Sequence, residues 1–110
     1  MIHMLSAFDM KPGEALAEMQ TAYAAFVAEL REAGLIVDAG PIGQRVADTP
    51  MDTDAARSHQ YFSVMSFRDR AQLDAAYAHI DARRRPATGT HLAMYRRLTN
   101  SVFLCWEDQD

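Results

Sequence analysis

Apolar residues recur along the chain with two different spacings, and these spacings predict where helices and strands lie. Between Glu14 and Ala33 the apolar positions fall three or four residues apart, which is typical of the buried stripe of an amphipathic helix. Gly34 follows directly, and glycine is the residue that most often stops a helix. The pattern therefore predicts a helix of about five turns over residues 14–33.

Four shorter apolar runs are typical of strands, and two further segments are typical of helices. Strands are predicted at residues 2–8, 35–46, 59–67 and 102–106. A second helix is predicted to begin near Asp69, whose side chain can cap it, with Gln72 three positions on as in a capping box. A short third helix is predicted at residues 90–98. The order is β-α-β-β-α-(α)-β, and we expect residues 1–110 to form a single domain.

This order favours one topology, a four-stranded antiparallel sheet with both main helices on one face. Right-handed crossovers leave few other ways to place two β-α-β units in one layer. The second strand then lies at a sheet edge. Pro41 interrupts that strand and has no N–H to donate to a ladder, so an edge is where it is tolerated. The polar residues 47–58 predict a long loop after it.

Two helices can cover only one face of such a sheet, yet its strands carry apolar residues on both faces. In the run "HQYFSVMSF" (residues 59–67), Tyr61 and Met65 point one way while Phe62 and Val64 point the other. The uncovered face would measure roughly 330 Å², which approaches the largest apolar patch typical of a monomer. We therefore expect a homodimer through the sheet faces; the alternative is a monomer whose third helix folds beneath the sheet.

The two sides of the third strand differ in character, which suggests a role for each. His59, Tyr61, Ser63 and Met65 share one parity and mix polar with apolar groups, whereas Phe62 and Val64 are purely apolar. We expect the mixed set to face a cavity and the apolar pair to pack against the helices.

Three segments carry a resemblance to a known family: "FDMKPGEAL" (8–16), "SFRDRAQLDAAYAHI" (66–80) and "HLAMYRRLTNSVFLCWED" (91–108). They are similar to the dimeric α/β-barrel, or ferredoxin-like, superfamily, which includes antibiotic-biosynthesis monooxygenase-type, EthD-like and stress-responsive barrel proteins. The chain most resembles an uncharacterised bacterial family within that group. The resemblance implies an α+β, ferredoxin-like βαββαβ fold with a short extra helix before the last strand. It also implies a dimer whose two sheets face each other and enclose a cavity.

That cavity is where we expect a ligand, a small apolar or amphipathic molecule such as an acyl or aromatic acid. The predicted ligand-binding residues are His59, Tyr61, Ser63, Met65, His91, Tyr95 and Trp106. Two alternatives stay open. The protein is a cofactor-free monooxygenase or isomerase that uses His59 or His91 as a base, or it is a module that only dimerises.

Other classes of function receive little support from the sequence. The net charge of −4 disfavours a nucleic-acid partner, and we interpret Arg83-Arg84-Arg85 as the basic end of a helix. Cys105 is the single cysteine, which excludes an internal disulfide and a multi-cysteine zinc site, and a thiol buried in its strand would be inert. No metal site is expected, because the sequence has no H-E-x-x-H pattern or further ligand cluster. There is no phosphate-binding loop or nucleotide fingerprint, so no cofactor is expected.

We also expect no membrane span, because no stretch approaches ~18 consecutive apolar residues. The chain does not open with a charged segment followed by an apolar run. A cytoplasmic location is the simplest expectation.

Overall fold

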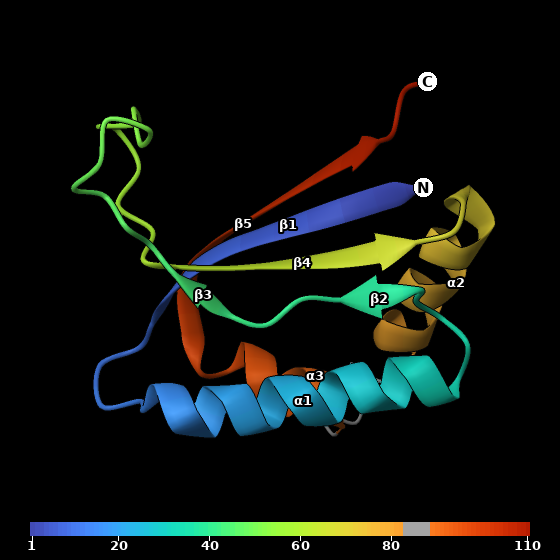
Figure 1. The fold of residues 1–110 in the computed structure, drawn as a ribbon. Helices are drawn as coiled ribbons and strands as arrows, with labels where there is room; N and C mark the ends of the chain where they lie inside the picture. Colours follow the sequence, from blue (N-terminus) through green and yellow to red (C-terminus); the bar gives the residue numbers. More distant parts are fainter. Residues whose placement is uncertain (83–88) are drawn as a thin grey trace.

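The computed structural model describes residues 1–82 and 89–110 as one sheet with helices against it (Figure 1). The strands are β1 (Ile2–Met10), β2 (Asp38–Ala39), β3 (Gly43–Gln44), β4 (Tyr61–Phe67) and β5 (Leu98–Glu107). The helices are α1 (Leu16–Glu32), α2 (Arg70–Asp81) and α3 (Thr90–Tyr95). The predicted basic helix end, Arg83-Arg84-Arg85, lies outside the described residues.

The strands pair in the order β2-β4-β1-β5, with β3 also against β4, and every pairing is antiparallel. The helices lie on one side of this sheet and leave the other side bare (Figure 1). The predicted α+β, ferredoxin-like fold is thus confirmed. The predicted second strand lies at the edge, as expected, and is split into β2 and β3 on either side of Pro41.

The ends of both main helices follow from local sequence. After α1, Gly34 adopts a φ of 70°, its N–H donates to Arg31 O over 3.0 Å, and the N–H of Leu35 donates to Leu30 O over 2.9 Å. This Schellman motif confirms the predicted stop. At the start of α2, the Asp69 carboxylate accepts from the Gln72 N–H at 2.9 Å, which confirms the predicted cap.

The two faces of the sheet are named here by what lies against them. The inner face, toward the helices, carries Met4, Ser6, Phe8, Ser63, Met65 and Phe67. The outer face carries His3, Leu5, Phe62, Val64, Ser66, Val102, Leu104 and Trp106, the opposite positions of the same strands. The prediction that Phe62 and Val64 pack against the helices is therefore wrong. A period of two decides which residues share a face, but not which face receives the helices.

The core between sheet and helices is divided into two clusters. One lies toward the start of β1 and the end of β4, where Ile2 and Phe67 pack against Phe26 and Leu30 of α1. The other lies toward the end of β1, where Phe8 packs with Met19 and Leu98. Met94 of α3 packs against both clusters. The inner face between the clusters is left for the candidate site.

The last strand differs most from its prediction, being longer than residues 102–106. A register shift between Ala7 and Asp9 allows β5 to continue past a bulge, where Asn100 adopts a φ of 55°. At the edge of the sheet β5 is only partly covered, so Cys105 is exposed. The prediction of a buried thiol is therefore wrong for this chain taken alone.

Candidate functional site

A cavity of about 640 Å³ lies between the inner face of the sheet and the helices. β1, β4 and β5 form its floor, α1 covers it, and α2 and α3 contribute the remaining walls. Its volume is within the range of small-molecule sites. The lining is mostly apolar and aromatic, and no lysine, arginine, aspartate or glutamate is among the described residues that line it.

The floor is hollow because two small residues occupy the middle of the inner face. Ser6 of β1 and Ser63 of β4 are direct register partners. On either side of the pair the inner face carries large side chains: Met4 and Met65 toward one core cluster, Phe8 and Tyr61 toward the other. Bulky residues at the two serine positions would let the clusters merge. The order of large and small side chains along the inner face of β1 and β4 therefore determines where the cavity lies.

Tyr23 of α1 stands over this floor and ties the helix to the sheet edge. Its hydroxyl donates to the carbonyl of Gly40, between β2 and β3, at 3.0 Å. Burial of the phenol is the largest influence on the Tyr23 pKa and raises it, while interaction with the Ser63 hydroxyl acts in the opposite direction. The phenol therefore stays protonated, and its O–H donates a hydrogen bond to the Gly40 carbonyl.

An aromatic group from α1 and α3 forms one wall. The ring of His91 lies 5.5 Å from Tyr95, nearly parallel at 20°, and 5.3 Å from Phe26 at 58°. His91 and Tyr95 are one helical turn apart, which is why their rings stack. A flat ligand could extend this stack into the cavity.

Three residues that line the cavity are also exposed to solvent. Tyr77 of α2, Tyr95 of α3 and Phe103 of β5 line the cavity and are also among the exposed apolar residues. The Tyr95 hydroxyl lies 3.4 Å from Ser101 Oγ and so joins α3 to β5 at this place. The cavity is therefore reached by solvent at residues from three elements, α2, α3 and β5.

The cavity brings together some of the predicted binding residues and not others. Ser63, Met65, His91 and Tyr95 line it. His59 does not, although it is buried: its Nε2 donates to the carbonyl of Asn100 at 2.8 Å and supports the bulge in β5. Tyr61 stacks on Phe8 at 5.9 Å in the second core cluster.

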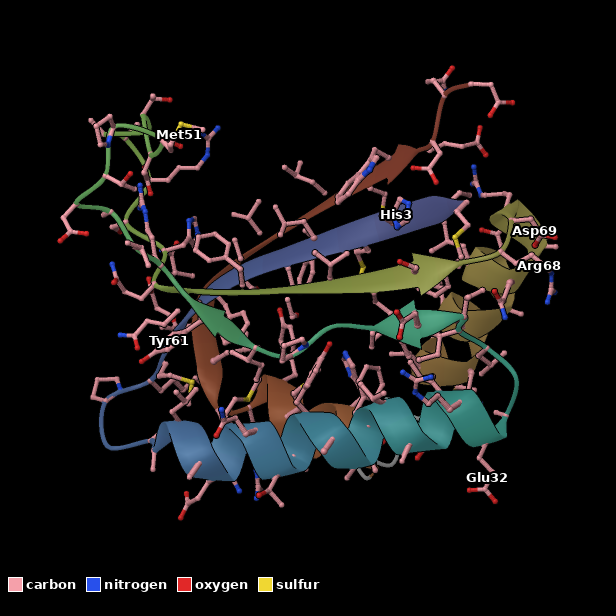
Figure 2. All side chains as sticks on the ribbon, in the orientation of Figure 1. His3, Glu32, Met51, Tyr61, Arg68 and Asp69 are labelled. Carbon is pink, nitrogen blue, oxygen red and sulfur yellow. The ribbon has the colours of Figure 1, made fainter. Side chains whose placement is uncertain are left out.

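Trp106, also a predicted binding residue, belongs to the outer face. Its ring lies 5.3 Å from that of His3, which contacts Ser66 through Nδ1 at 2.7 Å and Asp108 through Nε2 at 2.9 Å. The placement of His3 on β1 can be followed in Figure 2. This group is separated from the cavity by the sheet itself.

Most residues that line the cavity were not predicted as site residues, and Ser6, Tyr23 and Phe103 are the most informative of them. The signal for Ser6 was present, as a single hydroxyl within the apolar run "IHMLSAF". Tyr23 was assigned to the buried stripe of α1, correctly, but its hydroxyl has a role that periodicity does not reveal. Phe103 lies on the inner face only because of the register between β1 and β5, where it opposes Ser6.

The loop after β3 is held by its own ion pairs and lies at one end of the sheet. The Arg45 side chain binds Asp52 through two nitrogens at 2.8 and 2.9 Å, and also donates to the carbonyls of Asp54 and Arg57. Met51 marks the tip of the loop, away from α1 (Figure 2). These contacts hold residues 45–57 together as one unit.

Metal binding and membrane insertion receive no support from the described residues. They contain no group of three or more histidine, cysteine, aspartate or glutamate side chains arranged to hold a metal ion. None of the helices within residues 1–82 and 89–110 is long and apolar enough to cross a bilayer.

Solved structures with the same arrangement share little sequence with this chain. At3g17210 from Arabidopsis thaliana superposes with a TM-score of 0.76 at 7% identity, covering 100% of this chain and 97% of that one. A mutant of SnoaB, a cofactor-independent oxygenase from Streptomyces nogalater, gives 0.69 at 14%, covering 99% and 93%. A dimeric ferredoxin-like protein of unknown function from Jannaschia sp. CCS1 gives 0.67 at 16%, covering 97% and 98%.

This chain shares its fold with these three proteins. At such identities the likeness shows the fold, in agreement with the superfamily that the sequence resembles. No family model matches the chain, and no curated protein matches it in sequence.

Proposed function

We propose that the protein is a homodimer, paired through the outer faces of its sheets, that binds a small apolar or amphipathic molecule in the cavity between sheet and helices of each subunit. The site differs from the inter-sheet cavity expected from the sequence. Ser63, Met65, His91 and Tyr95 keep their proposed binding role, while His59 and Tyr61 are reassigned to supporting the fold and Trp106 to the dimer contact.

The observation that carries the binding proposal is an apolar cavity of about 640 Å³ in the middle of a small protein. Closely packed interiors leave few voids larger than a water molecule. An open space of this size between two separate core clusters forfeits packing energy, which a bound apolar molecule would restore.

The dimer proposal rests on the bare outer face. Val64, Leu104 and Trp106 are respectively 36, 58 and 45% exposed, on adjoining strands that the helices do not cover. A contiguous apolar surface of this kind marks an interaction site. The Jannaschia protein of the same fold is dimeric.

Binding is tested with N-phenyl-1-naphthylamine, an uncharged probe that fluoresces when it leaves water. We expect saturable fluorescence and a rise in melting temperature with probe concentration. Because the outer face is also apolar, two matched variants of β4 locate the probe. Ser63→Leu fills the cavity and should abolish binding, whereas Ser66→Leu makes the same change on the outer face and should not.

The absence of any saturable probe binding would contradict the proposal and leave the third hypothesis, a module that only dimerises. Equal loss of binding in Ser66→Leu and Ser63→Leu would move the site to the outer face.

A second candidate function is cofactor-independent oxygenation. SnoaB has the same fold and is a cofactor-independent oxygenase, and here an imidazole, that of His91, forms part of the cavity wall. In such a reaction His91 would accept a proton from a phenolic substrate, making it electron-rich enough to react with O₂. His59, the other predicted base, is held by Asn100 away from the cavity.

An oxygen electrode tests this candidate with 1-naphthol as substrate. We expect protein-dependent O₂ consumption that is lost in His91→Phe, a variant that keeps the stacked ring and removes the base. Retained binding of N-phenyl-1-naphthylamine by that variant is the control for folding. Unchanged O₂ consumption in His91→Phe, or none in the wild type, would contradict an oxygenase role on this type of substrate.

A further inference from the structure

The cavity restricts the charge of its ligand, given that it binds one as proposed above. Its polar groups among the described residues are hydroxyls and the His91 imidazole, with no acidic or basic side chain besides. Burial of a carboxylate without a partner of opposite charge is unfavourable. A free acid, which the sequence had suggested, is therefore a poor occupant of the floor.

The floor also offers a specific hydrogen-bonding position. Ser63 is 8% exposed, and its register partner Ser6 faces the same space. Ser6 makes no hydrogen bond through its side chain to any other described residue. No fully buried side-chain oxygen or nitrogen among those residues lacks a partner, so the Ser6 hydroxyl is open to the cavity. It is available both as a donor and as an acceptor.

Tyr23 determines which hydrogen-bonding groups on the floor stay free for a ligand. Its proton is directed to the Gly40 carbonyl at 3.0 Å, so the phenol oxygen can only accept from the cavity side. The Ser63 hydroxyl interacts with that phenol. On the floor of the cavity, the donor that stays free for a ligand is therefore the Ser6 hydroxyl, with Ser63 Oγ beside it as an acceptor.

We propose that the ligand is an uncharged, flat aromatic molecule that carries a carbonyl or hydroxyl oxygen, and that the Ser6–Ser63 pair receives this oxygen. The ring system lies against the aromatic wall formed by Phe26, His91 and Tyr95, and the oxygen points to the centre of the floor. This inference rests on the proposed cavity site and adds the chemical class of its occupant. The serine pair is then a specificity determinant.

Three naphthalenes of similar size separate the possible classes: 2-ethylnaphthalene, 2-acetylnaphthalene and 2-naphthoate. They differ only in a hydrocarbon, carbonyl or carboxylate substituent, and each is titrated by displacement of N-phenyl-1-naphthylamine. We expect the wild type to bind the ketone about three- to tenfold more tightly than the hydrocarbon, the range of one or two neutral hydrogen bonds. The carboxylate should bind more weakly than either.

Two variants then assign the preference. Ser6→Ala and Ser63→Ala should each reduce the advantage of the ketone while leaving the hydrocarbon affinity unchanged, because neither removes apolar surface. Ser66→Ala on the outer side of β4 is the matched control and should keep the full preference. Retained hydrocarbon binding shows that a variant is folded.

The outcomes separate this inference from the proposal beneath it. Equal binding of ketone and hydrocarbon by the wild type, or a preference that survives in both serine variants, would overturn the role of the pair and leave the cavity site intact. Tightest binding of 2-naphthoate would overturn the uncharged class. Failure of all three, and of the fluorescent probe, would overturn the cavity site itself.

Discussion

The two faces of this sheet are built from the same strands, yet one encloses a cavity and the other presents a continuous apolar surface. On the inner face, large side chains gather at the two ends and a serine pair lies between them, so a cavity opens under α1. On the outer face, Leu5, Val64 and Leu104 lie side by side without an interruption of this kind. An apolar surface that is continuous suits a flat partner, whereas one with a polar gap suits a small ligand.

The comparison teaches that the apolar content of a strand is a poor guide to its role. Phe62 and Val64 are more apolar than Ser63, yet it is Ser63 that lies on the helix-covered face. What distinguishes the faces is where the small polar residues lie. The predictions that follow alter one face at a time, beginning with the largest expected effect.

A charge at the centre of the outer face should separate the subunits. Leu104→Glu places two carboxylates in a two-fold symmetric interface without partners, which costs several kcal/mol. We expect the dimer to weaken by more than about 100-fold. Light scattering after gel filtration should show twice 12.3 kDa for the wild type and 12.3 kDa for the variant.

The control is Ala25→Glu, which adds the same charge on the exposed side of α1 and should stay dimeric. A wild-type mass of 12.3 kDa at micromolar concentration would contradict the dimer outright.

Removal of the imidazole from the outer face should have a smaller effect on the same equilibrium. His3→Ala loses the contacts with Ser66 and Asp108 and the ring contact with Trp106. These contacts lie within one chain and position the Trp106 ring on the outer face, so we expect the dimer to weaken by less than about tenfold. Sedimentation across a dilution series measures it. Probe binding in the cavity should not change, and a parallel loss of both would show that the two faces are coupled.

Loss of the Tyr23 hydroxyl should destabilise the fold without affecting the dimer. Tyr23→Phe removes the hydrogen bond to Gly40, and the free energy of unfolding should fall by about 1 kcal/mol. Tyr95→Phe is the matched control, because its exposed hydroxyl lies 3.4 Å from Ser101 and should contribute little. Urea denaturation of both variants checks the difference. Equal losses would mean that Tyr23 does not link α1 to the edge of the sheet.

The loop after β3 should loosen in acid. Hydrogen bonds from Arg57 and from the N–H groups of Ala56 and Arg57 lower the pKa of Asp54 from 3.8 to about 2. A lowered carboxyl pKa stabilises the folded loop above pH 4, and that contribution is lost as the pH falls toward 2.

Limited proteolysis with pepsin at pH 4, 3 and 2 should therefore show increasing cleavage within residues 47–58. Asp54→Asn, which cannot ionise, should show a smaller rise in cleavage than the wild type at the same pH values, and this comparison corrects for the activity of pepsin itself. Cleavage of the wild type that is independent of pH would contradict this assignment.

Much of the fold could be predicted because its signals are local. The stripe of α1, the stop at Gly34, the cap at Asp69 and the edge position required by Pro41 each depend on a few neighbouring residues. Together these local signals favour one topology, an antiparallel sheet with both main helices on one face, and the structure adopts this topology. The ends of β5 were not predictable, because its extension depends on a bulge against β1.

The candidate site was less accessible to sequence reasoning, and the reason is geometric. Ser6 and Ser63 are far apart in the chain and meet only through the register of β1 with β4. The character of its residues predicts that Phe62 and Val64 of β4 face the helices, whereas in the structure Ser63 and Met65 do. His91 and Tyr95 were found because helical spacing alone places them together. His59 was singled out as an ionisable group, but a backbone carbonyl occupies its Nε2.

The most direct test of the account is a crystal structure of the purified protein with N-phenyl-1-naphthylamine. We predict density for the probe between the Ser6–Ser63 pair and Tyr23 in each subunit, with a second copy of the chain seated on the outer face. Probe density between two outer faces, with the space beneath α1 closed by side chains, would contradict the account.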